Sequence, residues 1–348
     1  MSRIALKKKI AQMLMVGFDG YDIKDNHQIT EAIGRYHLGG VILYDLEEIN
    51  YKLKNIKSPK QVQKLVENLQ NLSDEELLVG IDHEGGQVIR LKEEYGFPKT
   101  FSHQHLGTLN DPSLTYEKSA EMAGTSSALG FNLNFAPVVD LSLNPDNPII
   151  GKRERSFSGD PQVVTSHARQ FVKAHKDAGI ISCIKHFPGH GSSSGDSHLG
   201  FVDVTETWSE IELAPYKKLI TEEQVDCVMT AHVFNKNIDP DYPATLSRVF
   251  ISKILRKEIG FDGVVISDDL NMGAIKDNYD LEQSLRLAIN AGVDILLVSY
   301  NEDYKEELCV NLISIIKSLV EKGSVSEERI NESYSRVRTL KNKLERTA

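Results

Sequence analysis

A polar segment of fourteen residues concentrates side chains that could move protons. From Lys185 to His198 the sequence reads Lys-His-Phe-Pro-Gly-His-Gly, four further residues, then Asp-Ser-His, and so contains three histidines. It follows the apolar run 181–184, which is typical of a buried strand. A parallel α/β protein keeps its chemistry in such loops after strands.

Asp196 and His198 are candidates for an acid/base pair. Two residues apart in an extended segment, their side chains point the same way. A carboxylate that accepts a hydrogen bond from one ring nitrogen would fix the tautomer of the histidine and raise its pKa above the usual value of about 6.5. Such a histidine could act as general acid and then as general base. An Asp-x-His pattern alone is more often a solvated loop, so this interpretation requires a nucleophile elsewhere.

Asp268 is the candidate nucleophile, because it ends the apolar run 263–267. A carboxylate on a rigid strand could attack an anomeric carbon or stabilise positive charge on it. The adjacent Asp269 competes for this role. Neighbouring strand residues face opposite sides, so only one should face a pocket and the other should cap the segment 270–272. The residue chemistry alone leaves the choice between them open.

Two further segments could bind a polar ligand. Asp82 ends a strand before a Gly-Gly turn, and Arg90 lies eight residues later. Such a pair suits bidentate binding of sugar hydroxyls or of an anion. Arg153 and Arg155 form a second basic loop. The alternatives are a surface turn with a weak ion pair and an ordinary solvated run of charges.

Three other titratable residues near these segments receive less direct roles. Glu84, which precedes two glycines, is expected to be a structural acid that holds the turn. His190 is expected to be buried and hydrogen-bonded inside its loop. His232 ends an apolar run, and the sequence does not decide whether it lines the pocket.

Apolar runs typical of strands alternate with helical segments along the whole chain, and most are uninterrupted, as in strands buried on both faces. This order predicts an α/β fold of the (β/α)8 TIM-barrel type, as a single domain over residues 1–348, rather than a doubly wound sheet. The expected strands are 13–18, 40–44, 77–82, 132–139, 181–187, 227–233, 263–268 and 294–299. After a first helix, the expected helices are 59–72, 113–129, 161–178, 208–222, 247–259, 281–291, 304–322 and 326–344.

The predicted topology brings the polar strand ends together. Chemistry in such barrels lies at the C-terminal ends of the strands. Five of the expected strands end in ionisable residues, at Asp82, Asp140, Lys185-His186, His232 and Asp268. The loops 45–58, 140–160, 187–207 and 234–247 should crowd the same mouth. Helix N-capping is the alternative for any single Asp, but it explains five strand ends together poorly.

Composition narrows the partners and the compartment. The 348 residues carry a formal net charge of −10, which argues against nucleic acid and anionic membrane as partners. The sequence contains no apolar run of the roughly 20 residues that span a bilayer. Three separated cysteines have no metal-binding spacing and fit a reducing compartment, so a cytoplasmic location is expected. The basic and apolar N-terminus is interpreted as a helix and strand rather than as a signal peptide.

Five motifs in this order resemble glycoside hydrolase family 3, and its single-domain β-N-acetylglucosaminidase (β-hexosaminidase) branch in particular. They are D-x-E-G-G-x-V-x-R from Asp82, R-S-F from Arg155, K-H-F-P-G-H-G-x4-D-S-H from Lys185, M-T-A-H-V from Met229 and S-D-D-L-x-M from Ser267. The resemblance implies a (β/α)8-type barrel and a retaining exo-β-N-acetylglucosaminidase that needs no cofactor or metal.

The resemblance also assigns roles to residues of this chain. It implies that Asp268 is the nucleophile, rather than Asp269, and that His198 is the acid/base, with Asp196 as its partner. The positions that match residues binding the N-acetylglucosamine unit are Asp82, Arg90, Arg155, Lys185 and His186.

Three features depart from the usual family pattern and bear on the leaving group. His83 stands where Gln is common, residues 192–195 read Ser-Ser-Ser-Gly instead of a more acidic stretch, and the insertion 45–58 is longer than in the shortest members. The expected substrate is a small glycan containing N-acetylglucosamine. Fragments from bacterial peptidoglycan recycling are the candidates that the family implies. A monomer or weak dimer is expected.

Other activities are alternatives to this interpretation. Within the family these are a β-glucosidase and an N-acetylglucosaminide phosphorylase, because a histidine acid/base would not repel phosphate. A metal-dependent hydrolase could use His186, His190, Asp196 and His198 as ligands, but their spacings are irregular and no H-E-x-x-H motif is present. A non-catalytic glycan-binding barrel is the alternative from a different functional class.

Overall fold

Eight parallel strands form the centre of the computed structural model, which describes residues 4–46, 53–222, 225–299 and 308–345. Their order is β11-β9-β7-β6-β3-β2-β1-β12. Each lies inside one of the eight predicted apolar runs. They are β1 (Leu14–Val16), β2 (Gly40–Leu43), β3 (Leu78–Ile81), β6 (Leu133–Asn134), β7 (Ile181–Phe187), β9 (Cys227–Thr230), β11 (Val264–Ile266) and β12 (Leu296–Val298).

Contacts between the two end strands of this order close the sheet into a barrel. Ile266 and Ile295 form a parallel bridge, and the Ser267 backbone N–H donates to the Ile295 carbonyl at 3.0 Å. All pairs among the eight strands are parallel. The prediction of a (β/α)8 barrel is therefore confirmed.

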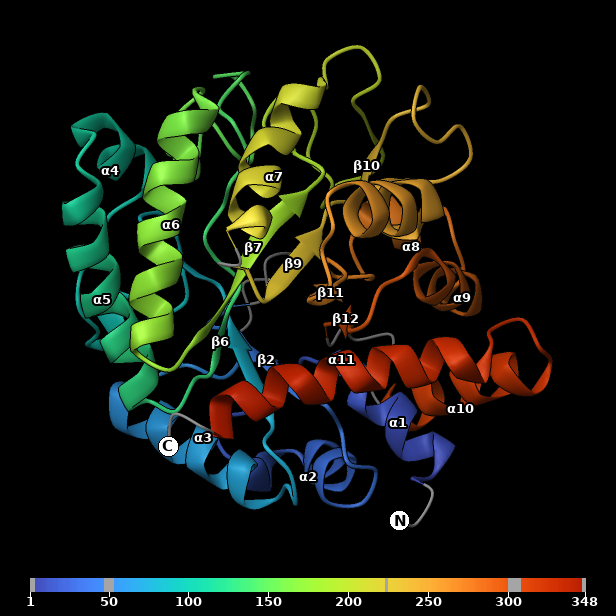
Figure 1. Cartoon of the computed structure of the whole chain (residues 1–348). Helices are drawn as coiled ribbons and strands as arrows, with labels where there is room; N and C mark the ends of the chain where they lie inside the picture. Colours follow the sequence, from blue (N-terminus) through green and yellow to red (C-terminus); the bar gives the residue numbers. More distant parts are fainter. Residues whose placement is uncertain (1–3, 47–52, 223–224, 300–307, 346–348) are drawn as a thin grey trace.

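Helices surround the barrel, as Figure 1 shows. Three of them begin in the same way, because Ser58, Asp111 and Asp160 accept hydrogen bonds from the first helical turn and a proline follows each. The surrounding helices are α1 (Leu6–Gln12), α3 (Pro59–Asn71), α5 (Pro112–Ala128), α6 (Pro161–Asp177), α7 (Ala214–Thr221), the π-helix η5 (Val249–Glu258), α9 (Leu281–Ala291), α10 (Leu308–Glu321) and α11 (Glu327–Glu345).

Short elements in the loops were not expected from the sequence. They are α2 (His27–Gly34), α4 (His103–Leu109), α8 (Gly273–Lys276), the hairpin of β4 (His83–Gly85) with β5 (Val88–Ile89), and the pair of β8 (Val202–Asp203) with β10 (Val233–Phe234). Most of these elements are too short to show a full hydrophobic period. Residues 47–52 of the insertion and 304–307 of the expected helix 304–322 lie outside the described residues.

The barrel interior is filled from the strands and closed at one end by α11. Met15, Ile42, Leu78 and Phe135 belong to one buried cluster with residues of the other strands. Three residues of α11 join the same cluster, namely Val337, Leu340 and Leu344. Figure 1 shows α11 crossing the end of the barrel opposite the long loops.

Asp294 fastens α11 to the barrel wall. Asp294 lies just before β12 in the sequence, and its carboxylate is fully buried. This carboxylate accepts hydrogen bonds from Arg329 and Ser333 of α11, each at 2.8 Å. It also pairs with Arg256 of η5. One carboxylate therefore joins the last helix to its neighbours.

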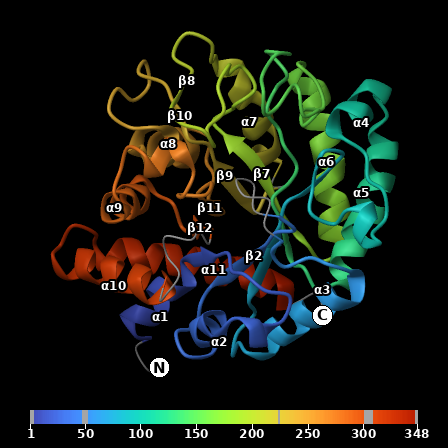
Figure 2. The same ribbon diagram turned by 180° about the vertical axis from the view of Figure 1, so that it is seen from behind.

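The opposite end of the barrel carries the connections that follow the strands. Seen from behind in Figure 2, α8 and the β8–β10 pair lie at this end. The loops 140–160, 187–207 and 234–247 follow the barrel strands β6, β7 and β9, as predicted, and contain β8 and part of β10. Among the described residues, no helix is both long and apolar enough to cross a membrane.

Candidate active site

Asp82, Lys185 and Arg90 form an ionic group at the barrel mouth. Asp82 directly follows β3, and its Oδ1 lies 2.8 Å from Lys185 Nζ on β7. Arg90, just after β5, approaches the other carboxylate oxygen at 3.2 Å. Burial opposes ionisation of Asp82, but Lys185 and Arg90 outweigh it and lower its pKa. Asp82 is therefore held as an anion beside two cations, and its side chain is still 16% exposed.

Glu84 lies behind this group and pairs with two cations. Arg155 Nε and NH2 donate to its two oxygens, each at 2.8 Å, and Lys185 Nζ lies 2.7 Å from Oε1. Burial opposes the charge of Glu84, but Arg155 and Lys185 lower its pKa far below the ordinary value. Glu84 thus holds Arg155 and Lys185 as well as belonging to the β4–β5 hairpin, and its structural role stays a prediction.

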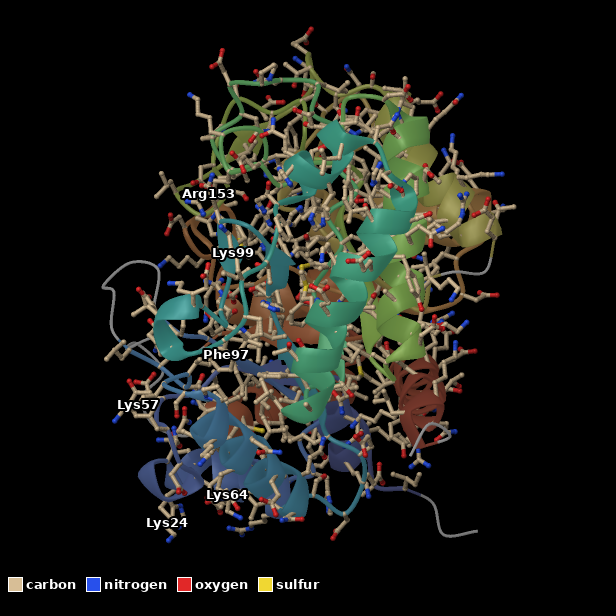
Figure 3. The ribbon with its side chains drawn as sticks, turned by 90° about the vertical axis from the view of Figure 1, so that its left-hand side faces the viewer. Lys24, Lys57, Lys64, Phe97, Lys99 and Arg153 are labelled. Atoms are coloured by element: carbon tan, nitrogen blue, oxygen red, sulfur yellow. The ribbon has the colours of Figure 1, made fainter. Side chains whose placement is uncertain are left out.

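Arg155 is more enclosed than the sequence suggested. Its remaining NH1 donates to the Ile149 carbonyl at 3.0 Å, and the side chain is only 8% exposed. Arg153, two residues earlier, lies instead on the surface of the side shown in Figure 3. Of the two arginines of this loop, only Arg155 belongs to the buried ionic network.

His186 is oriented from both sides of its ring. Its Nε2 lies 3.1 Å from Arg155 NH2, and its Nδ1 lies 2.7 Å from Asp140 Oδ2. Because a guanidinium can only donate, Nε2 accepts and Nδ1–H donates to Asp140. Asp140 was noted in the sequence only as a polar strand end. Its role as the partner of His186 depends on a loop contact across 46 residues, which no local pattern reveals.

Asp196 and His198 form the expected pair. His198 Nδ1 lies 2.7 Å from Asp196 Oδ1, which also accepts the His198 backbone N–H at 2.9 Å. Burial opposes the charge of Asp196, but its hydrogen bonds with His198 lower its pKa. The His198 side chain is 35% exposed, so it remains open to a ligand at the mouth.

His190 supports the same loop from inside, as predicted. Its Nδ1 lies 2.7 Å from Ser193 Oγ, and its Nε2 lies 3.3 Å from Ser197 Oγ. Burial lowers the pKa of His190 to about 4, so the ring is neutral at physiological pH. His190 therefore connects the start of the loop to the residue that precedes His198.

Asp268 and Asp269 differ in their surroundings, as the strand geometry predicted. Asp269 Oδ1 accepts the backbone N–H groups of Asn271 and Ser299, each at 3.0 Å, and burial raises its pKa. Asp268 interacts electrostatically with three histidines of the mouth. Burial opposes its ionisation, but His232, His186 and His198 outweigh that effect and lower its pKa.

His232 belongs to the framework around Asp268. Its Nδ1 lies 2.8 Å from Thr245 Oγ1, and its Nε2 lies 2.9 Å from the Asp269 carbonyl oxygen. Burial lowers the pKa of His232, although Asp268 opposes that shift. The structure thus places His232 close enough to Asp268 to favour the ionised form of that carboxylate. Both ring nitrogens of His232 are hydrogen-bonded to other residues of the protein.

The four residues of the alternative metal site have separate partners. His186 is hydrogen-bonded to Asp140, and His190 is hydrogen-bonded to serines of its own loop. Asp196 is hydrogen-bonded to His198. Within the part of the chain that the structure describes, no group of three or more His, Cys, Asp or Glu side chains is arranged to hold a metal ion.

The mouth of this barrel has the parts of an acid–base site directed at a polar ligand. It contains an ionised strand-end carboxylate, a histidine–aspartate pair on a loop, and a group of fixed charges. The class of protein is therefore a (β/α)8 barrel with an enzyme-like site at the C-terminal ends of its strands. The model of the glycosyl hydrolase family 3 N-terminal domain matches residues 5–340, and the chain belongs to glycoside hydrolase family 3.

Known relatives match most of this chain. A β-hexosaminidase of Tolumonas auensis is 35% identical over 293 residues, which cover 83% of each chain. β-Hexosaminidase A of Pseudoalteromonas piscicida is 31% identical over 347 residues, which cover 91% of this chain and 55% of the relative. This chain thus spans about half the length of that relative.

Solved structures agree with the sequence matches. A family 3 β-N-acetylglucosaminidase from a Paenibacillus species is 36% identical with a TM-score of 0.89, covering 99% of this chain and 64% of that one. A β-N-acetylhexosaminidase from Beutenbergia cavernae is 28% identical with a TM-score of 0.86, covering 98% of this chain and 99% of that one.

Proposed function

We propose that the protein is a retaining exo-β-N-acetylglucosaminidase. The observation that carries the proposal is the pairing of His198 with Asp196 at 2.7 Å on a loop at the same barrel mouth as the ionised Asp268. The names of the family 3 relatives support the N-acetylhexosaminide specificity.

In the first step, Asp268 attacks the anomeric carbon. Its lowered pKa keeps it ionised at neutral pH, as a nucleophile requires. Protonated His198, held by Asp196, gives its proton to the glycosidic oxygen, and the leaving group departs. The product is a glycosyl ester on Asp268.

In the second step, neutral His198 accepts a proton from water. The water oxygen attacks the anomeric carbon, the ester bond to Asp268 breaks, and the sugar leaves with retained configuration. Asp196 stays ionised through both steps and stabilises the imidazolium form of His198.

The charged group of Asp82, Arg90 and Lys185 at the barrel mouth binds the sugar in this proposal. Asp82 can accept hydrogen bonds from sugar hydroxyls, while Arg90 and Lys185 donate. His186 and Arg155 complete the set that the family pattern assigns to the N-acetylglucosamine unit. Because Asp82 is already fixed by two cations, it loses little conformational freedom when a ligand binds.

The wider setting of the reaction is also proposed. We assign the complete catalytic set to residues of this barrel, and a cytoplasmic location with cell-wall fragments as substrates. The three cysteines are buried and unpaired, which fits a reducing compartment. We further expect a monomer or weak dimer, which sedimentation velocity would test.

The function is tested with aryl β-glycosides of N-acetylglucosamine, glucose and xylose. Wild type should prefer the N-acetylglucosaminide, and Asp268→Ala should abolish its turnover because the covalent step is lost. Asp262→Ala, at an exposed residue just before the same strand, is the matched control and should remain active. Activity retained in Asp268→Ala would contradict the assignment, and preference for the glucoside would favour the β-glucosidase alternative.

A further inference from the structure

Glu212 is a buried acid that no step of the proposed reaction uses. It lies in the short 3-10 helix η3 (Glu210–Leu213), which precedes α7, and its exposed fraction is 0%. Its Oε1 accepts a hydrogen bond from the Ser192 hydroxyl at 2.6 Å, and its Oε2 accepts one from the Gly191 backbone N–H at 3.2 Å. Both donors belong to the loop that carries Asp196 and His198.

The loop approaches Glu212 closely because of a glycine. A Cβ atom at Gly189 would lie 2.6 Å from Glu212 Cβ and 2.8 Å from Oε2, and Gly189 has a φ of 120°. Any other residue here would push the loop away from η3. Trp208, two residues before η3 begins, donates a hydrogen bond from Nε1 to the Pro188 carbonyl at 3.2 Å. The segment 208–212 thus holds the first part of the loop at several points.

From this anchored part, a chain of hydrogen bonds leads to the histidine. His190 bonds to Ser193 and Ser197, and Asn147 Nδ2 donates to the His190 carbonyl at 2.8 Å. Beyond Ser197 the loop turns outward, and Leu199 is 83% exposed. The position of His198 therefore depends on contacts that begin at Gly191 and Ser192, together with the backbone hydrogen bonds that α8 donates to the Ser197 and His198 carbonyls.

The groups facing Glu212 make its charge state sensitive to pH. Among the described residues, no Lys or Arg forms an ion pair with Glu212. The titratable groups near it are the Asp140 carboxylate, after β6, which repels its charge, and the buried Tyr216 hydroxyl of α7, whose own pKa Glu212 helps to raise. Burial raises the pKa of Glu212 to about 7, with Asp140 adding repulsion and the Ser192 hydrogen bond opposing the shift.

We propose that Glu212 is a positioning residue for the acid/base: its carboxylate clamps the loop at Gly191 and Ser192 and so fixes His198 over the scissile oxygen. The inference rests on the proposed function, because it concerns proton donation by His198. An ionised carboxylate accepts both hydrogen bonds. A protonated one presents an O–H where it needs an acceptor, so the clamp weakens as Glu212 gains a proton.

The test compares leaving groups, because misplacing an acid affects only substrates that need a proton. Glu212→Gln should lower kcat/KM for an alkyl N-acetylglucosaminide by about tenfold or more, on the scale of one lost charge-assisted hydrogen bond. It should change kcat/KM for the dinitrophenyl glycoside by less than about threefold, because that leaving group departs unprotonated. Glu210→Gln, at an exposed residue of the same helix, is the control and should change neither.

A pH profile separates positioning from a general structural role. Wild type and Glu212→Gln should differ most above pH 7, where wild-type Glu212 is ionised, and should converge toward pH 5, where it is protonated. Ser192→Ala removes one of the two contacts but keeps the carboxylate. It should show the same leaving-group dependence with a smaller loss, which keeps the test available if Glu212→Gln folds poorly.

The outcomes distinguish this inference from the function on which it rests. Equal losses of kcat/KM for both leaving groups would overturn the positioning role, and so would no loss in either Glu212→Gln or Ser192→Ala. In both cases, normal turnover by the wild type would leave the proposed function intact. A wild-type protein that cleaves neither glycoside would overturn the proposed function and this inference together.

Discussion

Glu84 and Glu212 show that burial alone does not decide the charge of an acid. Both are buried, at 1% and 0% exposure. Glu84 contacts Arg155 and Lys185, and its pKa falls far below the ordinary value in spite of burial. Glu212 has only neutral hydrogen-bond donors, and burial raises its pKa to about 7. One residue is a fixed anion of the buried ionic network, whereas the other titrates near neutrality.

Replacing Glu84 by Gln should destabilise the protein in a pH-dependent way. At pH 7 the loss should be about 3–5 kcal/mol, because buried Arg155 loses its carboxylate partner and buried Lys185 loses one of its two. The folded-state pKa of Glu84 is lowered, so its stabilisation is complete above the unfolded value of about 4.5 and is lost as pH falls. The gap between wild type and variant should therefore shrink below pH 5 in urea unfolding experiments.

Glu93→Gln is the matched control for this experiment, since Glu93 is exposed in the 3-10 helix η2 (Glu93–Tyr95) that follows the β4–β5 hairpin. It should change stability by less than about 0.5 kcal/mol at every pH. A gap between wild type and Glu84→Gln that stays constant or widens on acidification would contradict the account of this network.

At the scale of elements, the loop that carries His198 is held from two directions. Glu212 holds its beginning, and the segment after Asp268 holds its end. The N–H of Gly273, the first residue of α8, donates to the His198 carbonyl at 3.3 Å, and the Ala274 N–H donates to the Ser197 carbonyl at 3.2 Å. Asp268 and His198 are thereby linked through α8, although seventy residues separate them in the sequence.

Gly273→Ala should disturb this second contact. A Cβ at Gly273 would lie 2.9 Å from the His198 carbonyl oxygen and 3.1 Å from the Gly200 nitrogen, so the loop backbone must move. A misplacement of about 1 Å can lower a rate by about 100-fold. We expect kcat/KM for alkyl N-acetylglucosaminides to fall by about 10- to 100-fold and that for dinitrophenyl glycosides to change little.

Gly124→Ala provides the comparison for this substitution. Gly124 lies in α5, and a Cβ there would meet no atom within 4 Å. The change should leave both substrates' kcat/KM unaltered and raise stability slightly, as alanine replaces glycine inside a helix. If Gly273→Ala behaved like Gly124→Ala, the contact between α8 and the loop would have no part in placing His198.

The sequence could predict the parts of the fold and of the site whose contacting residues lie close together along the chain, but not those whose contacting residues lie far apart. The eight strands followed from uninterrupted apolar runs, and the Asp196–His198 pair followed from a spacing of two residues. The partner of His186 and the clamp on Ser192 were not predictable in this way. Asp140 lies 46 residues before His186, and Glu212 lies 20 residues after Ser192, so only the folded barrel brings them together. Elements of two to four residues, such as α8, show too short a period to be found.

Over the whole molecule, the two ends of the barrel have different duties. At one end α11 fills the interior with Val337, Leu340 and Leu344, and Asp294 ties it to the wall. At the other end the strands deliver Asp82, Lys185 and Asp268. In barrels of this type, residues at the first end maintain stability and residues at the second carry out chemistry.

The central claim is that Asp268 forms a bond to the sugar, and trapping that intermediate tests it most directly. A 5-fluoro N-acetylglucosaminyl fluoride should react with the folded protein, and mass spectrometry of its peptides should place one fluorosugar on Asp268. The adduct should persist longer in His198→Ala, because water is no longer activated. Turnover of the reagent without any labelled peptide, or a label on Asp269, would contradict the account.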